Sequence, residues 1–160
     1  MSDTPTSRRR REMLTEAVLA SVVGLLIGAL FHWQGNASNV AMEGRSLFLW
    51  VAHQWLLAGG AFSHGWLMPL VSLGFVWQSR RAVEEAPKEV FRPGFVLVLL
   101  CLLAHWAGLR AQQPRLSLIA FAGLLWCVPL FLYGRRVARL LLFPFGYLLL
   151  CFMSYYLDTL

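Results

Sequence analysis

Long apolar segments separated by clusters of cations constrain the fold of this chain more than any other feature. A membrane-spanning helix needs about 17–25 mostly apolar residues, and several segments of the chain meet or approach that length. Only 14% of the residues are charged, whereas a soluble domain has about 25%. The sequence therefore predicts an integral membrane protein. The expected spans are residues 13–31, 62–78, 94–109, 116–134 and 139–157.

The fold class follows from the chemistry of the bilayer. No water is present in the hydrocarbon to satisfy backbone polar groups, so spanning segments must be helices or closed barrels. None of the apolar segments alternates with the period of a barrel strand. The two shortest segments carry Trp66, Trp77 and Trp106 near their ends, where indole rings can anchor a short span at the interface. We predict an all-α, polytopic bundle of about five spans.

The distribution of cations predicts the orientation of the bundle. With five spans and a cytoplasmic N-terminus, the cytoplasmic side receives eleven cations and the outer side three, as the positive-inside rule requires. Residues 1–12 then form a basic cytoplasmic tail, and residues 13–160 form a single transmembrane bundle. The eleven are Arg8, Arg9, Arg10, Arg11, Arg80, Arg81, Lys88, Arg92, Arg135, Arg136 and Arg139, and the three are Arg45, Arg110 and Arg115.

Residues 46–61 are also apolar and offer a competing topology. If they spanned the membrane, everything downstream would change sides, leaving six cations inside and eight outside, against the positive-inside rule. Ser46, His53 and Gln54 fall on one narrow stripe of a helix whose other positions are apolar. We therefore expect an interfacial helix or a re-entrant segment on the outer face.

The N-terminal arginines resemble the charged region of a secretory signal, but the apolar run that follows is long and has no small-residue cleavage site. We interpret it as an uncleaved first span. Arginines beside a span set topology and contact anionic lipid, so membrane lipid is the expected partner. No basic face with interleaved aromatic residues predicts nucleic-acid binding.

Four histidines are predicted to gather at one depth on the outer side: His32, His53, His64 and His105. Polar groups near a bilayer are costly and are candidates for function, although interfacial histidines also bond simply to backbone or water. A haem held between His64 and His105 is a weaker alternative. No spacing typical of a metal site is present, so no metal or other cofactor is predicted.

The cysteines Cys101, Cys127 and Cys151 each fall near the middle of a different span. An isolated buried cysteine usually behaves as a small hydrophobic residue. A reactive thiolate needs a nearby cation or helix N-terminus, and none of the three has a cationic neighbour in the sequence. We expect these cysteines to pack structurally.

Two segments carry a resemblance to a known family. Residues 62–69 read Phe-Ser-His-Gly-Trp-Leu-Met-Pro and are followed by Trp77 and Arg80, and residues 139–148 contain Phe143-Pro144 at the start of a later span. The first segment resembles the Ser-His-Gly signature of exosortases and archaeosortases, and the second resembles the family's Phe-Pro segment. The resemblance covers roughly residues 46–150.

The resemblance implies a multi-pass protein of the bacterial or archaeal cytoplasmic membrane. Members of the family are thought to act in the cell envelope as cysteine proteases or transpeptidases that cleave and sort proteins with C-terminal PEP-CTERM-type tails. Each tail comprises a Pro-Glu-Pro-type motif, a helix and a basic cluster. Ser63, His64 and Gly65 would support or dock such a tail on the outer face, and Pro69, Phe143 and Pro144 would be structural positions of the motifs.

One departure from the family limits the expected chemistry. The family's Cys-Ser-Gly nucleophile motif does not occur in these 160 residues, and Cys151 is followed by Phe152 and Met153. We therefore assign no catalytic residue and expect the chain to resemble the family's N-terminal half, inactive by itself. The alternative is a small non-enzymatic envelope protein that serves as a scaffold or assembly partner.

Overall fold

The computed structural model describes residues 5–36, 45–57, 65 and 67–157, and helices account for most of them. No strand occurs in this described part of the chain, so the predicted all-α fold is confirmed. The helices are α1 (Pro5–Trp33), α2 (Leu47–Leu57), α3 (Leu67–Glu85), α4 (Gly94–Ala111) and α5 (Pro114–Leu157).

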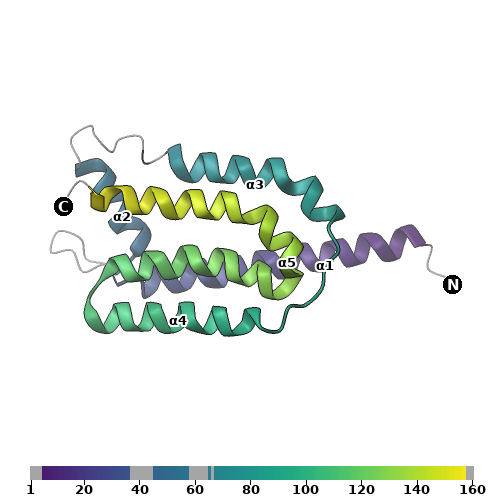
Figure 1. The fold of residues 1–160 in the computed structure, drawn as a ribbon, viewed down its shortest axis with the longest axis horizontal. Coiled ribbons are helices and arrows are strands. Elements are labelled where there is room, and N and C mark those ends of the chain that lie inside the picture. Colours follow the sequence, from purple (N-terminus) through teal and green to yellow (C-terminus); the bar gives the residue numbers. More distant parts are fainter. Residues whose placement is uncertain (1–4, 37–44, 58–64, 66, 158–160) are drawn as a thin grey trace.

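Helix α5 consists of two legs that fold back on each other at Gly134 (Figure 1). The backbone at Gly134 has φ 85° and ψ −177°, a conformation that L side chains rarely adopt. A Cβ atom there would also lie 2.6 Å from the carbonyl oxygen of Glu89. Glycine is therefore required at this turn. The first leg (residues 114–133) and the second leg (residues 135–157) correspond to the fourth and fifth predicted spans.

A tight turn joins α4 to the first leg of α5. Gln112 adopts a left-handed conformation with φ 52°, and the N–H of Gln113 donates to the carbonyl of Gly108 at 2.9 Å. A left-handed residue with such a backward bond is a common way to end a helix. Pro114 then begins α5, because proline fits the first turn of a helix. The turn places α4 and the first leg side by side and antiparallel (Figure 1).

Three described helical stretches are long and apolar enough to cross a membrane: Leu14–Trp33, Gly94–Ala111 and Pro114–Leu149. The last of them covers the first leg of α5 and continues into the second as far as Leu149. Helix α3 is not in this set, because its last two turns carry Arg80, Arg81, Glu84 and Glu85. It begins at Leu67, and residues 62–64 of the predicted second span lie outside the described residues. The count of five spans therefore stays a prediction.

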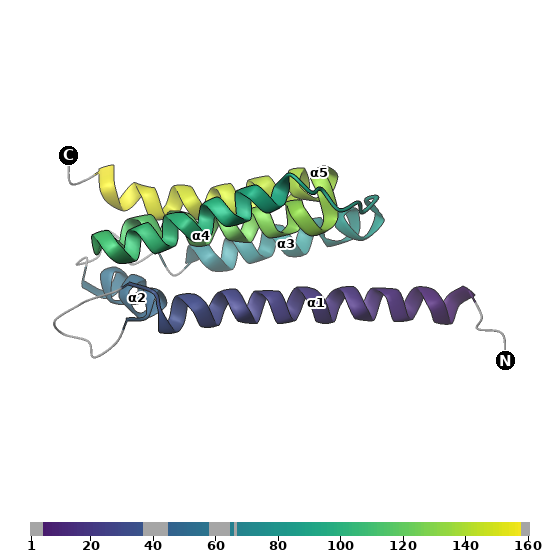
Figure 2. The same ribbon diagram turned by 90° about the horizontal axis from the view of Figure 1, so that it is seen from below.

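The long helices run between two ends of the molecule. Helices α3, α4 and α5 pack together, and α1 lies along one side of this bundle (Figure 2). The short helix α2 lies at the end where α1 and α4 terminate and α3 begins (Figure 1); we call this the α2 end. Within the segment predicted as an outer-face helix, residues 46–61, Leu47–Leu57 is helical, and residues 58–61 lie outside the described residues.

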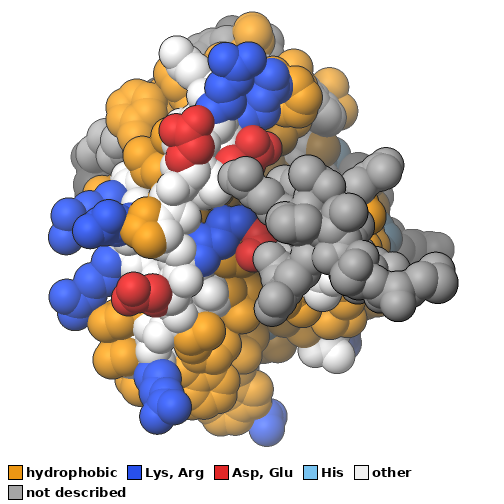
Figure 3. Space-filling view, turned by 90° about the vertical axis from the view of Figure 1, so that its right-hand side faces the viewer, with side chains coloured by type: hydrophobic (Ala, Val, Ile, Leu, Met, Phe, Trp, Pro, Cys, Tyr) orange, Lys and Arg blue, Asp and Glu red, His pale blue; other side chains and the backbone are white. Residues whose placement is uncertain are grey.

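The opposite end, which we call the arginine end, holds the α3–α4 connection and the turn at Gly134 (Figure 1). Seen end-on, lysine and arginine side chains are spread over it, with acidic side chains between them (Figure 3). The predicted grouping of cations therefore corresponds to one end of the molecule. Its cations are Arg80, Arg81, Lys88, Arg92, Arg135, Arg136 and Arg139, and the first turns of α1 carry Arg8 to Arg11.

A hydrophobic core cluster lies toward the α2 end. It combines the end of α1, helix α2 and the first leg of α5, through Phe31, Leu47, Val51, Leu118, Ala120 and Leu124. Many long apolar side chains nevertheless point outward: Leu25 of α1 is 73% exposed, and Leu103 of α4 is 58% exposed. A bare apolar surface of this kind is what lipid contact requires.

Candidate functional site

Gly65 is the residue of the predicted Ser63-His64-Gly65 signature that the structure describes, and Ser63 and His64 lie outside the described residues. Gly65 is buried against Trp55 of α2. A Cβ atom on Gly65 would lie 2.5 Å from both Cδ1 and Nε1 of the indole, closer than any side chain can approach. The glycine therefore lets the end of the signature pack directly on α2.

Helix α2 is in turn attached to the end of α1. Ser46 precedes α2, and its Oγ accepts a hydrogen bond from the N–H of Leu49 at 3.4 Å, the arrangement of an N-cap. The same Oγ lies 3.0 Å from Nδ1 of His32, near the end of α1. One end of α2 is thus held by α1, and Trp55 near its other end packs on the signature.

A second histidine joins α4 to the first leg of α5. His105 is only 3% exposed, its Nδ1 lies 3.1 Å from Ser117 Oγ, and its ring packs on Phe31 with the centroids 4.3 Å apart. Asn36, just beyond α1, donates a hydrogen bond to the carbonyl of Gly108. We call His32, Asn36, Ser46, His105 and Ser117 the polar cluster, and it holds four helices together at the α2 end.

The sequence predicts that the four histidines gather at the outer side. His32, His53 and His105 all lie on helices that meet at the α2 end, two of them in the polar cluster. His64 lies outside the described residues, so its pairing with His105 around a haem stays untested. Among the residues that the structure describes, no group of three or more histidine, cysteine, aspartate or glutamate side chains is placed to hold a metal ion.

The two motif segments meet across α3 and the second leg of α5. Pro144 is fully buried, and its carbonyl accepts a hydrogen bond from Ser72 Oγ of α3 at 2.9 Å. The ring of Phe143 stands edge-to-face against Phe75, with the centroids 4.9 Å apart. Phe143 and Pro144 therefore anchor the helix that follows the Ser-His-Gly signature.

An apolar cavity of about 320 Å³ lies between α2, α3 and α5; we call it the α2 cavity. Pro69, from the first turn of α3, lines it together with Trp55, the neighbour of Gly65, and Leu148, one turn beyond Pro144. The signature helix, the Phe-Pro helix and α2 thus contribute to the walls of one cavity.

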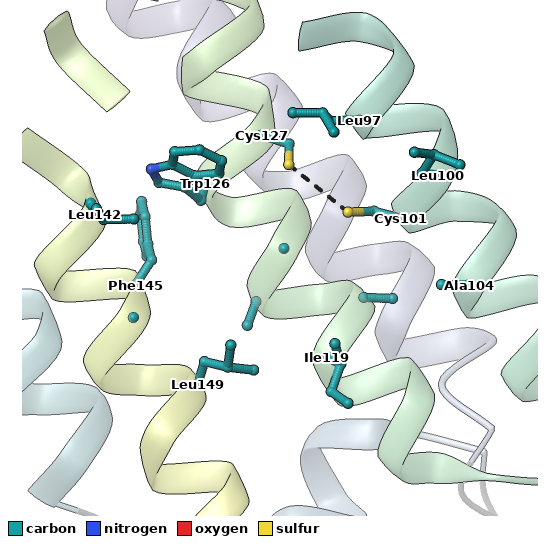
Figure 4. Close-up of a pocket in the computed structure, with 14 residues that line it drawn as sticks. Leu97, Leu100, Cys101, Ala104, Ile119, Trp126, Cys127, Leu142, Phe145 and Leu149 are labelled. Atoms are coloured by element: carbon teal, nitrogen blue, oxygen red, sulfur yellow. Dashed lines mark hydrogen bonds between the residues drawn. The ribbon is translucent and has the colours of Figure 1, made fainter. Parts of the chain in front are cut away.

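The cysteines Cys101 and Cys127 lie away from this site, within the α4–α5 bundle. Their sulfur atoms point toward each other, 4.0 Å apart (Figure 4), beside a groove of about 350 Å³ lined by apolar side chains. No cation or histidine is among the residues that line it. Because thiolate formation needs such a neighbour, this surrounding matches the predicted packing role. The side chain of Cys151 is outside the described part of the structure.

Sequence reasoning missed the contribution of the polar residues that join the helices. Asn36 has φ 62°, and Ser72 and Ser117 lie within apolar helices and are buried. The available signals were Gly35-Asn36 directly after a helix, which is typical of a helix end, and a lone serine within an apolar run, which needs a hydrogen-bond partner. The partners themselves could not be predicted.

These observations define a class: a multi-pass helical membrane protein with a Ser-His-Gly segment ahead of one helix and a Phe-Pro segment within the helix that packs against it. The sequence model of the transmembrane exosortase family matches residues 50–159, which include both segments. The chain belongs to the transmembrane exosortase family, and the predicted resemblance is confirmed. Comparison with curated proteins found no match, and neither did comparison with solved structures.

Proposed function

We propose that the protein takes part in sorting envelope proteins with PEP-CTERM-type tails, by providing the surface on which the tail docks outside the cytoplasmic membrane. The observation that supports this most is the α2 cavity. Residues of both family segments and of α2 surround it, and it lies at the α2 end. An apolar pocket with a few polar groups nearby is the usual form of a ligand site.

The proposed topology has five spans and a cytoplasmic N-terminus. Helix α2 and the signature then lie on the outer side of a bacterial or archaeal membrane. The distribution of charge supports it, because cations concentrate at the arginine end and only Arg45, Arg110 and Arg115 lie toward the α2 end. Cytoplasmic loops are generally the richer in lysine and arginine.

The cleavage chemistry itself requires a group that these residues do not supply. In acyl transfer a thiolate attacks the scissile carbonyl, the peptide nitrogen leaves as a protonated amine, and a second nucleophile then takes the acyl group from sulfur. These 160 residues contain no Cys-Ser-Gly sequence, and Cys101 and Cys127 face an apolar groove. The part of this chain in the protease or transpeptidase reaction is therefore to dock and position the tail.

The experiment that tests this role compares two histidine variants in the cells that make the protein. His64→Ala should abolish cleavage of PEP-CTERM-type tails, followed by the shift in size of the tagged substrate on a gel. His53→Ala, on α2 outside the signature, is the matched control and should leave cleavage intact. Normal cleavage in His64→Ala cells with normal amounts of the protein would contradict the proposed role.

The absence of Cys-Ser-Gly favours a second function, that of a non-enzymatic scaffold in envelope assembly. The two functions differ in what lies downstream in the gene. An in-frame Cys-Ser-Gly, followed by an arginine and a histidine beyond codon 160, would support the transpeptidase. A stop codon at that point, with tail cleavage unaffected by deletion of the gene, would support the scaffold.

A further inference from the structure

The arginine end contains a cavity of about 710 Å³ that the sorting function does not use. Its walls come from two segments that are far apart in the sequence: the α3–α4 connection at residues 87–91, and α5 on both sides of Gly134. Arg135, Arg136 and Arg139 all line it. We call it the arginine cavity.

Backbone and side-chain contacts hold the two walls together. The N–H of Phe91 donates to the carbonyl of Phe131 at 3.0 Å, and the N–H of Glu89 donates to the carbonyl of Tyr133 at 3.4 Å. The guanidinium of Arg135 lies over the ring of Phe91, 4.4 Å from its centroid. The cavity is therefore a built feature of the α5 turn and not a space between independent loops.

The charge of the arginine cavity is unbalanced. Arg136 and Arg139 are exposed, and no ion pair joins either of them to a carboxylate of the described residues. The nearby Lys88 is paired with Glu16 of α1, so that acid is already neutralised. Glu89 is the acidic residue that lines the cavity, against three arginines. The site therefore favours an anion.

The position of the cavity indicates which anion. It lies where the apolar legs of α5 turn (Figure 1), the depth at which lipid headgroups meet water. Val90, which lines the cavity, is 64% exposed, and Leu142, one turn beyond Arg139 on α5, is 54% exposed. A ligand with a phosphate and acyl chains would contact both the arginines and the apolar side chains. A guanidinium group can donate two parallel hydrogen bonds to phosphate oxygens.

We propose that the arginine cavity binds the phosphate of an anionic phospholipid, such as phosphatidylglycerol, through Arg136 and Arg139. Arg135 stacks on Phe91 and shapes the wall. This is a defined lipid site and differs from the general attraction that any basic loop has for an anionic membrane.

The test measures retained lipid by native mass spectrometry of the protein in a neutral detergent, titrated with phosphatidylglycerol or phosphatidylcholine. Wild-type protein should retain phosphatidylglycerol in preference. The double variant Arg136→Gln/Arg139→Gln should bind it about thirtyfold more weakly, at about 1 kcal/mol for each arginine. Glu89→Gln should bind it more tightly, since the opposing charge is removed.

The matched control is Arg81→Gln/Arg92→Gln, which removes two exposed cations from the same end but none from the cavity wall. It should retain the lipid like wild type. Equal losses in the two double variants would overturn the proposal in favour of diffuse attraction. Displacement of the lipid by millimolar inorganic phosphate would overturn it in favour of a free-anion site, as would equal binding of phosphatidylcholine.

Discussion

Gly65 is the residue at which the family signature meets the rest of the molecule. Its lack of a side chain matters because the indole of Trp55 occupies the space where a Cβ atom would lie. The sequence marked this glycine as part of a motif, but the contact that explains it comes from a helix ten residues earlier. Pattern alone cannot reveal such a tertiary neighbour.

We predict that Gly65→Ala destabilises the protein by about 1–3 kcal/mol, because the new methyl group forces the indole or the backbone to shift. The measurement is the thermal unfolding midpoint in detergent. Gly74→Ala in α3, where nothing lies within 4 Å of the new Cβ, is the control and should change stability little. Equal midpoints for the two variants would refute the packing of Gly65 on Trp55.

The hydrogen-bond partners within the polar cluster also could not be predicted from the sequence. The sequence placed His32 and His105 at the outer side, and the structure brings both to the α2 end. That each bonds to a serine, His32 to Ser46 and His105 to Ser117, depends on how the helices pack. The hydropathy pattern contains no information on that packing.

At the scale of helices, the apolar pattern predicts which segments are helical better than it predicts where each helix ends. The predicted span 94–109 corresponds to α4, Gly94–Ala111, because Pro93 and the left-handed Gln112 bound both the apolar run and the helix. Helix α3 instead continues to Glu85, well past the apolar residues. Hydropathy marks where apolar residues end, whereas a helix continues until its backbone is interrupted.

The turn of α5 at Gly134 is the element on which the arrangement of the last two spans depends. We predict that Gly134→Ala destabilises the protein by about 2 kcal/mol or more, because alanine is strained at positive φ and its Cβ would meet the backbone oxygen of Glu89. Gly146→Ala, in the second leg with open space around it, should be neutral or slightly stabilising. Denaturation of both variants in the same detergent compares them, and a loss in Gly146→Ala alone would contradict this account.

At the scale of the whole molecule, the distribution of cations predicts an orientation in the membrane that can be tested. A reporter fused after Arg81 should be found in the cytoplasm, and one fused after Arg115 should be found outside, because the arginine end is the cation-rich one. If residues 46–61 crossed the membrane instead of lying at its surface, both reporters would give the opposite result. Reporter activity on each side of the membrane therefore decides between the two topologies.

The arrangement of α1 could not have been predicted from the sequence. Its apolar run predicts a span, and the stretch Leu14–Trp33 is a helix long and apolar enough to cross a membrane, but helix periodicity does not say how closely it packs. Near its last turns Phe31 is fully buried, whereas Leu25 and Leu26 remain exposed. An evenly apolar helix gives no indication of which face meets protein and which meets lipid.

Docking of a sorting tail at the α2 end is tested most directly by site-specific photo-crosslinking. A photoreactive residue replaces Leu67, two positions after Gly65 and 59% exposed, or Val90 at the arginine end, 64% exposed. We predict that Leu67 crosslinks to the Pro-Glu-Pro motif of a PEP-CTERM-type tail and that Val90 does not, as identified by mass spectrometry of the joined peptides. Crosslinking of that motif at Val90, or at neither position in cells that contain both proteins, would contradict the account.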